Sequence, residues 1–137
     1  MDGKITLITP PDFFENENKS LLFIHLSDND QHKVSEWFAR SQIKENINIY
    51  FYNDETNVEW FLYAINRCDY KFIDIDNTTI ITNVLLGHLL AKNKFYYKVE
   101  DDNVYQICQF LNNNRITKIE DFLEKAFNVK DRNETRL

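Results

Sequence analysis

Hydrophobic residues in this chain occur in two patterns, short continuous runs and longer stretches with helical spacing. The continuous runs are rich in β-branched and aromatic residues, which predicts strands; they are residues 4–9, 20–26, 47–52, 70–75 and 95–99. The stretches in which apolar residues recur every three or four positions predict amphipathic helices. They begin near residues 28, 58, 79, 104 and 119.

Strands that alternate with helices of this length predict right-handed crossovers and a parallel sheet. We therefore expect an α/β fold, a three-layer Rossmann-like or flavodoxin-like domain with a mainly parallel five-stranded sheet. A chain of 137 residues fits one domain, which we expect over residues 1–128, with residues 129–137 as a frayed tail.

Three helix starts carry local signals. Asp28 or Asp30 is the expected N-cap of the first helix. The segments 56–59 (TNVE) and 117–120 (TKIE) both match the capping box, in which a Thr hydroxyl and a Glu carboxylate bond reciprocal backbone N–H groups.

The composition limits which binding partners and which cellular compartment are expected. A net charge of −6 repels phosphate backbones, so we expect no nucleic-acid partner. The absence of an apolar run of about 18 residues predicts no membrane span, and the acidic N-terminus lacks a signal-type core. Cys68 and Cys108 lie on apolar helical stripes, as expected for buried thiols in a reducing cytoplasm. The surplus of Asn, Ile, Lys, Phe and Tyr is typical of low-GC genomes, including those of many phages.

The loop after the strand at 70–75 is where an α/β protein usually places its chemistry. Here it contains Asp74 and Asp76 in a D-x-D-x-T pattern that ends at Thr78. This pattern resembles the first motif of haloacid-dehalogenase-type phosphatases, which implies a nucleophilic Asp, a second Asp and Mg²⁺. The motif lies past mid-chain, however, and such enzymes normally carry it on their first strand. The alternative interpretation, which we prefer, is that Asp76 and Asn77 turn the chain and cap the next helix.

Other kinds of site have weaker support. Neither of the two glycines stands in a phosphate-cradling loop, which argues against dinucleotide binding. The three histidines, His25, His32 and His88, have no metal-ligand spacing. We therefore predict no cofactor and no metal, and we expect His25 to be a satisfied buried or rim side chain.

If the crevice beyond the strand ends does bind a nucleotide, polar residues at those ends would form the site. These residues are His25, Ser27, Asn53, Asp76 and Asn83.

Over roughly residues 4–97 the order of elements resembles the nucleoside 2-deoxyribosyltransferase-like family. The resemblance depends on five segments in sequence: KITLITPPDFF, SLLFIHLS, VSEWFAR, NVEWFLYAINRCD and TNVLLGHLLAKNKFYY. It implies a Rossmann-like fold and an ancestral activity on the bond between base and sugar.

The same resemblance implies that the catalytic residue has been lost. The family's nucleophile is a Glu two residues before a glycine, and the matching position before Gly87 is Leu85. An aliphatic side chain cannot attack an anomeric carbon. The family's glycine-containing turn after the second strand is His25-Leu26-Ser27 here, and the missing glycine restricts close approach of a ligand.

Two main hypotheses follow. The first is a pseudoenzyme that works as a protein-interaction or assembly module, through a protein partner or its own copies, in a phage or other virus. The second is a nucleoside- or nucleotide-processing enzyme that uses Asp74 or Asp76 instead. A nucleotide sensor that binds in the old crevice is the intermediate interpretation.

Overall fold

The computed structural model describes residues 3–41, 43–53, 57–75, 96–100 and 115–127. Five strands form one sheet in which every pair is parallel. The strands are β1 (Ile5–Ile8), β2 (Lys19–Ile24), β3 (Ile47–Tyr52), β4 (Tyr70–Asp74) and β5 (Tyr96–Lys98). Their order across the sheet is β1-β3-β2-β4-β5.

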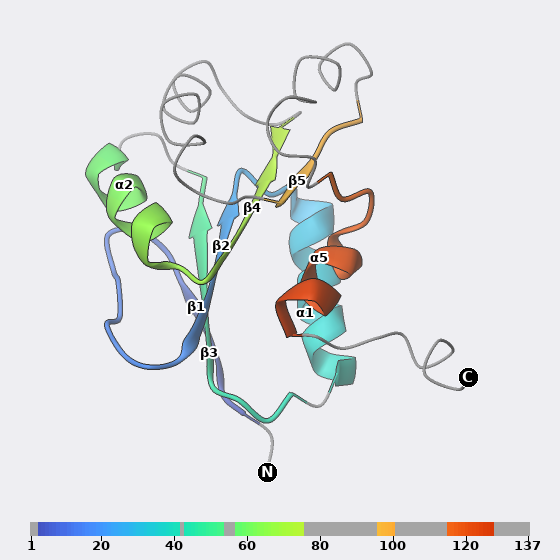
Figure 1. The fold of residues 1–137 in the computed structure, drawn as a ribbon, viewed down its shortest axis with the longest axis horizontal. Helices are drawn as coiled ribbons and strands as arrows, with labels where there is room; N and C mark the ends of the chain where they lie inside the picture. Colours follow the sequence, from blue (N-terminus) through green and yellow to red (C-terminus); the bar gives the residue numbers. More distant parts are fainter. Residues whose placement is uncertain (1–2, 42, 54–56, 76–95, 101–114, 128–137) are drawn as a thin grey trace.

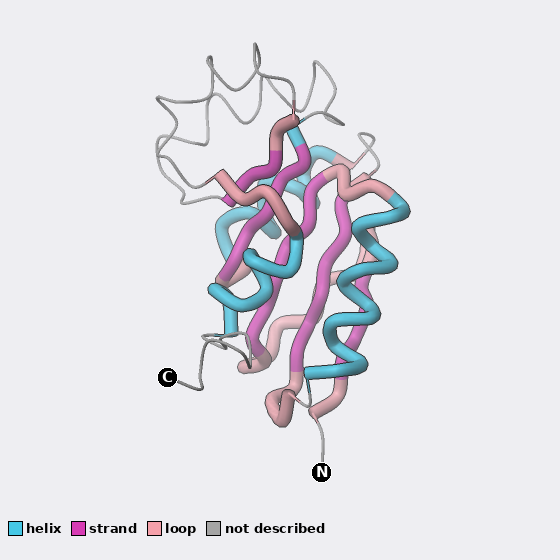
Figure 2. Tube along the Cα trace, turned by 90° about the vertical axis from the view of Figure 1, so that its right-hand side faces the viewer, coloured by secondary structure: helices cyan, strands magenta, loops and turns pink. Residues whose placement is uncertain are grey.

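Helices cover both faces of this sheet. The described helices are α1 (Asp28–Ser41), α2 (Val58–Arg67) and α5 (Ile119–Phe127). Figure 1 shows α2 on one side of the sheet and α1 with α5 on the other, and the turned view in Figure 2 shows the strands running side by side between them. The predicted three-layer Rossmann-like α/β fold is therefore confirmed.

The sheet is the middle layer because its central strands are apolar on both faces. Leu21 and Phe23 of β2 face α1 and α5, whereas Leu22 and Ile24 face α2, and all four are fully buried. Burial of a side chain of this size contributes about 1.5–3 kcal/mol. A continuous apolar run is the expected sequence of a strand covered on both sides.

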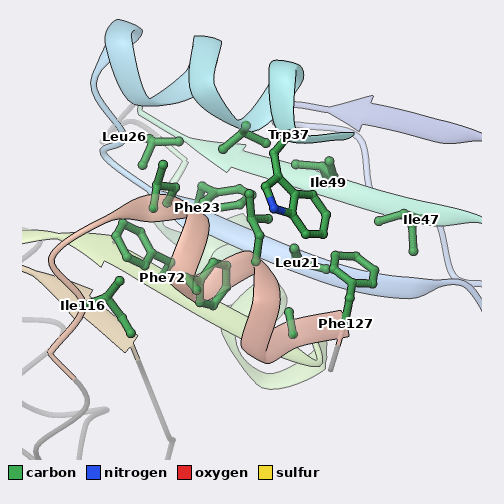
Figure 3. Close-up of a cluster of buried hydrophobic side chains, with 14 residues drawn as sticks. Leu21, Phe23, Leu26, Trp37, Ile47, Ile49, Phe72, Ile116 and Phe127 are labelled. Atoms are coloured by element: carbon green, nitrogen blue, oxygen red, sulfur yellow. The ribbon is translucent and has the colours of Figure 1, made fainter. Parts of the chain in front are cut away.

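Aromatic rings join α1 and α5 over one face of the sheet. Trp37 of α1 stacks on Phe127 of α5 with ring centroids 5.6 Å apart, and the ring edge of Phe122 meets Phe23 of β2 at 5.5 Å. Figure 3 shows Phe23, Trp37 and Phe127 in the space between the two helices and the strands. The C-terminal helix is thus part of the core although β5 precedes it by about twenty residues.

The connection between β1 and β2 is not helical, yet it crosses the sheet face that α2 also covers. Phe13 packs on the α2-side core, with its ring stacked on that of Tyr50 at 4.4 Å. This crossover and the one through α2 both lead toward β4, and α1 returns on the opposite face, so all three have the same hand.

The helix starts differ from the predicted caps. Ser27 caps α1, because its Oγ accepts a hydrogen bond from Asp30 N at 3.2 Å, so the choice of Asp28 or Asp30 was wrong. The N-cap of α2 is Asn57, which makes no side-chain capping bond. Because α2 begins one residue later than the 56–59 box requires, Glu59 does not occupy the third helical position; Thr56 itself lies outside the described residues.

The prediction of a capping box at residues 117–120 is also wrong. Helix α5 begins at Ile119, two residues after Thr117 rather than one. Glu120 therefore occupies the second helical position, where its carboxylate does not close the box. The first turn of α5 is closed by the backbone, where Asp121 N donates to Lys118 O at 3.0 Å.

Several other predictions concern single elements. Cys68 is buried and free, as predicted. The helices predicted near residues 79 and 104, together with Cys108 and the tail at 129–137, lie outside the described residues. No helix in the described part of the chain is long and apolar enough to cross a membrane.

Candidate functional site

The carboxyl end of the sheet contains a topological switch point between β2 and β4. From β2 the chain crosses through α1 to β3 on one side, whereas β5 follows β4 on the other side. In open α/β sheets this divergence marks the crevice in which ligands bind. The register pairs Ile24 with Ile73, so His25 and Asp74 are the next neighbouring positions, at the switch point.

His25 has a constrained backbone at this point. Its φ is +57°, the left-handed region that few residues other than glycine adopt. Its N–H donates to Tyr52 O of β3 at 2.8 Å, and its ring meets the Tyr52 ring edge-on at 5.7 Å. The side chain is buried, in agreement with the expectation of a buried or rim histidine.

The structure brings together four of the residues predicted at the strand ends. His25 and Ser27 follow β2, Asn53 follows β3 and is exposed, and Asp74 ends β4 and is buried. The Oγ of Ser27 accepts the capping bond of α1, which leaves its O–H to donate elsewhere. The remaining predicted positions, Asp76, Asn83 and Leu85, lie outside the described residues.

A largely buried ion pair, which no sequence pattern indicated, lies beside these residues. Lys98 Nζ of β5 is 3.0 Å from Asp30 Oδ2 of α1, and the Asp30 side chain is 2% exposed. Glu100 lies 3.6 Å from the same ammonium. Burial alone lowers the pKa of Lys98, but the hydrogen bond and charge of Asp30, with smaller effects of Asp74 and Glu100, outweigh it and raise this pKa.

This ion pair changes what the amino end of α1 can bind. A helix amino end attracts anions because its first N–H groups and its dipole are positive there. In this chain the first turn carries Asp28 and Asp30, and the buried Asp30 carboxylate places a negative charge at that position. The Asp30 carboxylate, paired with Lys98, therefore occupies the place at which the helix amino end would otherwise attract a phosphate group.

The acidic side chains at this end do not form a recognisable metal site. Within the described ranges no group of three or more His, Cys, Asp or Glu side chains could hold a metal ion.

The opposite end of the sheet contains an open hollow of about 340 Å³. It lies between the connection at 9–18, the amino ends of β2 and β3, and the last turn of α2. Most of its lining is polar. The lining residues are Phe13, Phe14, Glu15, Asn16, Asn18, Ser20, Asn48, Tyr50 and Arg67.

Side chains from β3 hold the wall of this hollow in place. Asn48 Nδ2 donates to Asn16 Oδ1 at 2.9 Å, and Asn18 Nδ2 donates to Asn48 Oδ1 at 3.2 Å. The Tyr50 hydroxyl accepts from Phe14 N at 3.2 Å and donates to Phe14 O at 3.0 Å. Burial raises the pKa of the Tyr50 phenol, so it stays protonated and can serve both bonds.

The rim of the hollow exposes aromatic and charged groups. Phe14 is 46% exposed and Tyr63 of α2 is 37% exposed. The Arg67 guanidinium lies over the Tyr63 ring, 3.6 Å from its centroid, and its Nε donates to Glu15 Oε1 at 3.1 Å. We call Phe14, Tyr63, Arg67 and Glu15 the aromatic rim. Large exposed aromatic side chains next to an arginine are the composition of binding hot spots.

Neither the ion pair nor the hollow has a strong signal in the sequence. Lys98 stands among aromatic residues in a predicted strand, and a charge at such a position is a weak signal for a buried partner. The connection after β1 contains the pair Phe13-Phe14, which is unusual for a solvated loop and is the signal that could have found the hollow.

A scan against protein-family models and a search of curated proteins found no match for this chain.

Proposed function

We propose that this protein is a binding module of Rossmann-like fold that acts through a protein partner, without catalysis of its own. The observation that carries the proposal is the aromatic rim around the amino-end hollow, where Phe14 and Tyr63 are exposed next to Arg67. The degenerate resemblance to nucleoside 2-deoxyribosyltransferases, with Leu85 at the nucleophile position, supports the absence of catalysis. We further propose a cytoplasmic location, in the host if the protein is viral.

The chemistry of the hollow favours a polypeptide as the ligand. Its volume is at the lower end of the range for small-molecule pockets, roughly 300–1,000 Å³, which suits one inserted side chain. The aromatic rim extends beyond the hollow onto the outer face of α2, so a partner could cover both. Carboxamides inside and an exposed ion pair at the mouth favour an inserted side chain that is itself polar.

The test compares capture of a partner by matched surface variants. Immobilised wild-type protein is incubated with a lysate of the source organism, and bound proteins are quantified by mass spectrometry. We expect Phe14→Ser and Arg67→Ser to reduce capture of the same partner at least about tenfold. Leu7→Ser, which removes an exposed apolar side chain from a different surface, should retain it. Equal capture by all variants would contradict the role of the aromatic rim.

A second candidate function is nucleoside or nucleotide processing at the carboxyl end. The specific observation in its favour is that Asp74 is buried beside His25, whose backbone is held in a left-handed conformation at the switch point. Incubation with deoxynucleosides, a free base and simple phosphate esters, with and without Mg²⁺, decides between the two. We expect no turnover; turnover that is lost in Asp74→Asn or Asp76→Asn would establish the enzyme instead.

A further inference from the structure

The strand β1 forms one edge of the sheet, and its outer backbone groups face away from its neighbour. Among the residues that the structure describes, β3 is the strand that pairs with β1. The bond from Ile47 N to Lys4 O, at 2.9 Å, shows which residues face β3. Because neighbouring residues of a strand point their backbone groups in opposite directions, Lys4, Thr6 and Ile8 face β3. The N–H and C=O groups of Ile5 and Leu7 therefore face outward.

The two edges of the sheet differ in this respect. Beyond β5 the chain returns at Arg115, which forms an isolated bridge with Tyr97, and Ile116 N donates to Tyr97 O at 2.7 Å. At β1 the side chain of Leu7 is 61% exposed, the largest exposed fraction among the large hydrophobic residues described. Edge strands that expose apolar side chains are templates for pairing with another strand.

The order of residues in β1 makes this edge complementary to itself. Ile5 and Leu7 are apolar and share one face, and Thr6 lies between them. A two-fold axis through Thr6 places Ile5 of one chain opposite Leu7 of the other, with both pairs of backbone groups able to exchange hydrogen bonds. The same axis brings each exposed Leu7 against an Ile5 side chain, which removes apolar surface from water.

We propose that two copies of this chain associate through antiparallel pairing of their β1 strands, which joins two five-stranded sheets into one. The interface lies on a different surface from the aromatic rim, so it does not depend on the proposed binding function. The short strand offers four main-chain hydrogen bonds between Ile5 and Leu7 of the two copies. Two-stranded contacts of this size are weak, so we expect reversible association that depends on concentration.

Sedimentation of the full chain from about 1 µM to 1 mM, a range that covers weak association, tests the proposal. We expect the mass to rise from 16.5 kDa toward twice that value. Leu7→Lys should keep the protein monomeric because it places two charges at the interface. Leu7→Pro should do the same, because it removes an outward N–H that β3 does not use. Phe14→Lys, the matched change at another exposed residue, should leave the association unchanged.

A cysteine placed on the axis tests the register. In the proposed pairing the two Thr6 residues form a non-hydrogen-bonded pair with Cα atoms about 4.5 Å apart, within the range of a disulfide. Thr6→Cys should therefore form a disulfide-linked dimer under oxidation, in excess of the wild type. Leu7→Cys should not, because the two positions are displaced by about 7 Å along the strands.

A constant mass at all concentrations, or a dimer that Leu7→Lys leaves intact, would overturn the proposal. Failure of Thr6→Cys to link a dimer that Leu7→Lys abolishes would overturn the register.

Discussion

The two ends of the sheet use polar side chains in opposite ways. At the carboxyl end the buried Asp30 carboxylate is paired with the half-buried Lys98 ammonium, and the Ser27 hydroxyl caps a helix. At the amino end the carboxamides of Asn16 and Asn48 line an open hollow beneath exposed aromatic rings. Among the described residues, Asp30, Lys98 and Ser27 at the end where Rossmann-like domains usually bind ligands bond one another or a helix backbone, whereas the carboxamides at the amino end line an accessible hollow.

The largest expected effect is at the buried pair. Asp30→Ala removes the carboxylate and leaves Lys98 partly buried without its closest partner, so we expect a loss of about 3 kcal/mol in the free energy of unfolding. We choose the lower end of the usual range because the Lys98 side chain is 17% exposed and can turn toward water. Urea denaturation measures the change.

Asp28→Ala is the control for this variant, because Asp28 is an exposed acid in the same helical turn. It should cost less than about 1 kcal/mol. If Asp30→Ala and Asp28→Ala lower the free energy of unfolding equally, the Asp30–Lys98 ion pair does not account for the stability of the carboxyl end. The double variant Asp30→Leu with Lys98→Met should recover part of the loss, because it leaves neither charge unpaired.

The next effect tests the amino end. Asn48→Ala removes an amide that bonds Asn16 and Asn18, and we expect a loss of about 2 kcal/mol together with weaker binding at the aromatic rim. Asn66→Ala is the matched control, because the Asn66 amide is exposed and bonds only a carbonyl of its own helix. A stability loss in Asn48→Ala with unchanged partner capture would show that the hollow is structural.

A smaller effect is expected at Trp60. Its indole Nε1 donates to Asp12 O at 2.8 Å and thereby attaches the connection at 9–18 to α2. Trp60→Phe keeps a ring in the aromatic cluster but removes this bond, at a cost of about 1 kcal/mol. Thermal unfolding followed by circular dichroism measures the shift in melting temperature. A larger loss of stability in Trp60→Phe than in Asn48→Ala would contradict the expected order of effects.

The smallest effect is a dependence on pH. The pKa of Lys98 is raised above its ordinary value of 10.5, so the folded state binds this proton more tightly than the unfolded state. Its contribution to stability is fully present below pH 10.5 and is lost as the pH rises through the folded-state pKa. Other groups titrate there too, so the measurement is the difference in alkaline slope between wild type and Asp30→Ala. Parallel slopes would contradict the assignment.

The fold could be predicted from the sequence because its strands are buried on both faces. Runs such as SLLFIHL and INIYFY carry the pattern of covered parallel strands without reference to any distant residue. The helix caps were less predictable, because Lys118 precedes α5 although Thr117, a better capping residue, stands one position earlier, and α2 begins after Asn57 rather than after the first residue of the 56–59 box. Shifts of one residue at a helix end depend on tertiary packing, which local propensity does not contain.

The candidate sites were predictable only in part. Parallel strands bring their carboxyl ends together, so His25, Asn53 and Asp74 could be assigned to one end of the sheet from sequence alone. The pairing of Asp30 with Lys98, 68 residues apart, follows from the order of strands rather than from any local pattern. The hollow likewise depends on contacts between the connection after β1 and the side chains of β3.

The non-helical connection at 9–18 has one further consequence. A helix at this place would satisfy its own backbone groups, whereas here Phe14 depends on the Tyr50 hydroxyl for both of its main-chain hydrogen bonds. Deuterium exchange at the Phe14 amide would therefore report motions that break its hydrogen bond to Tyr50, a residue of the inner strand β3. Exchange of this surface amide is therefore coupled to opening of a hydrogen bond from the core of the sheet.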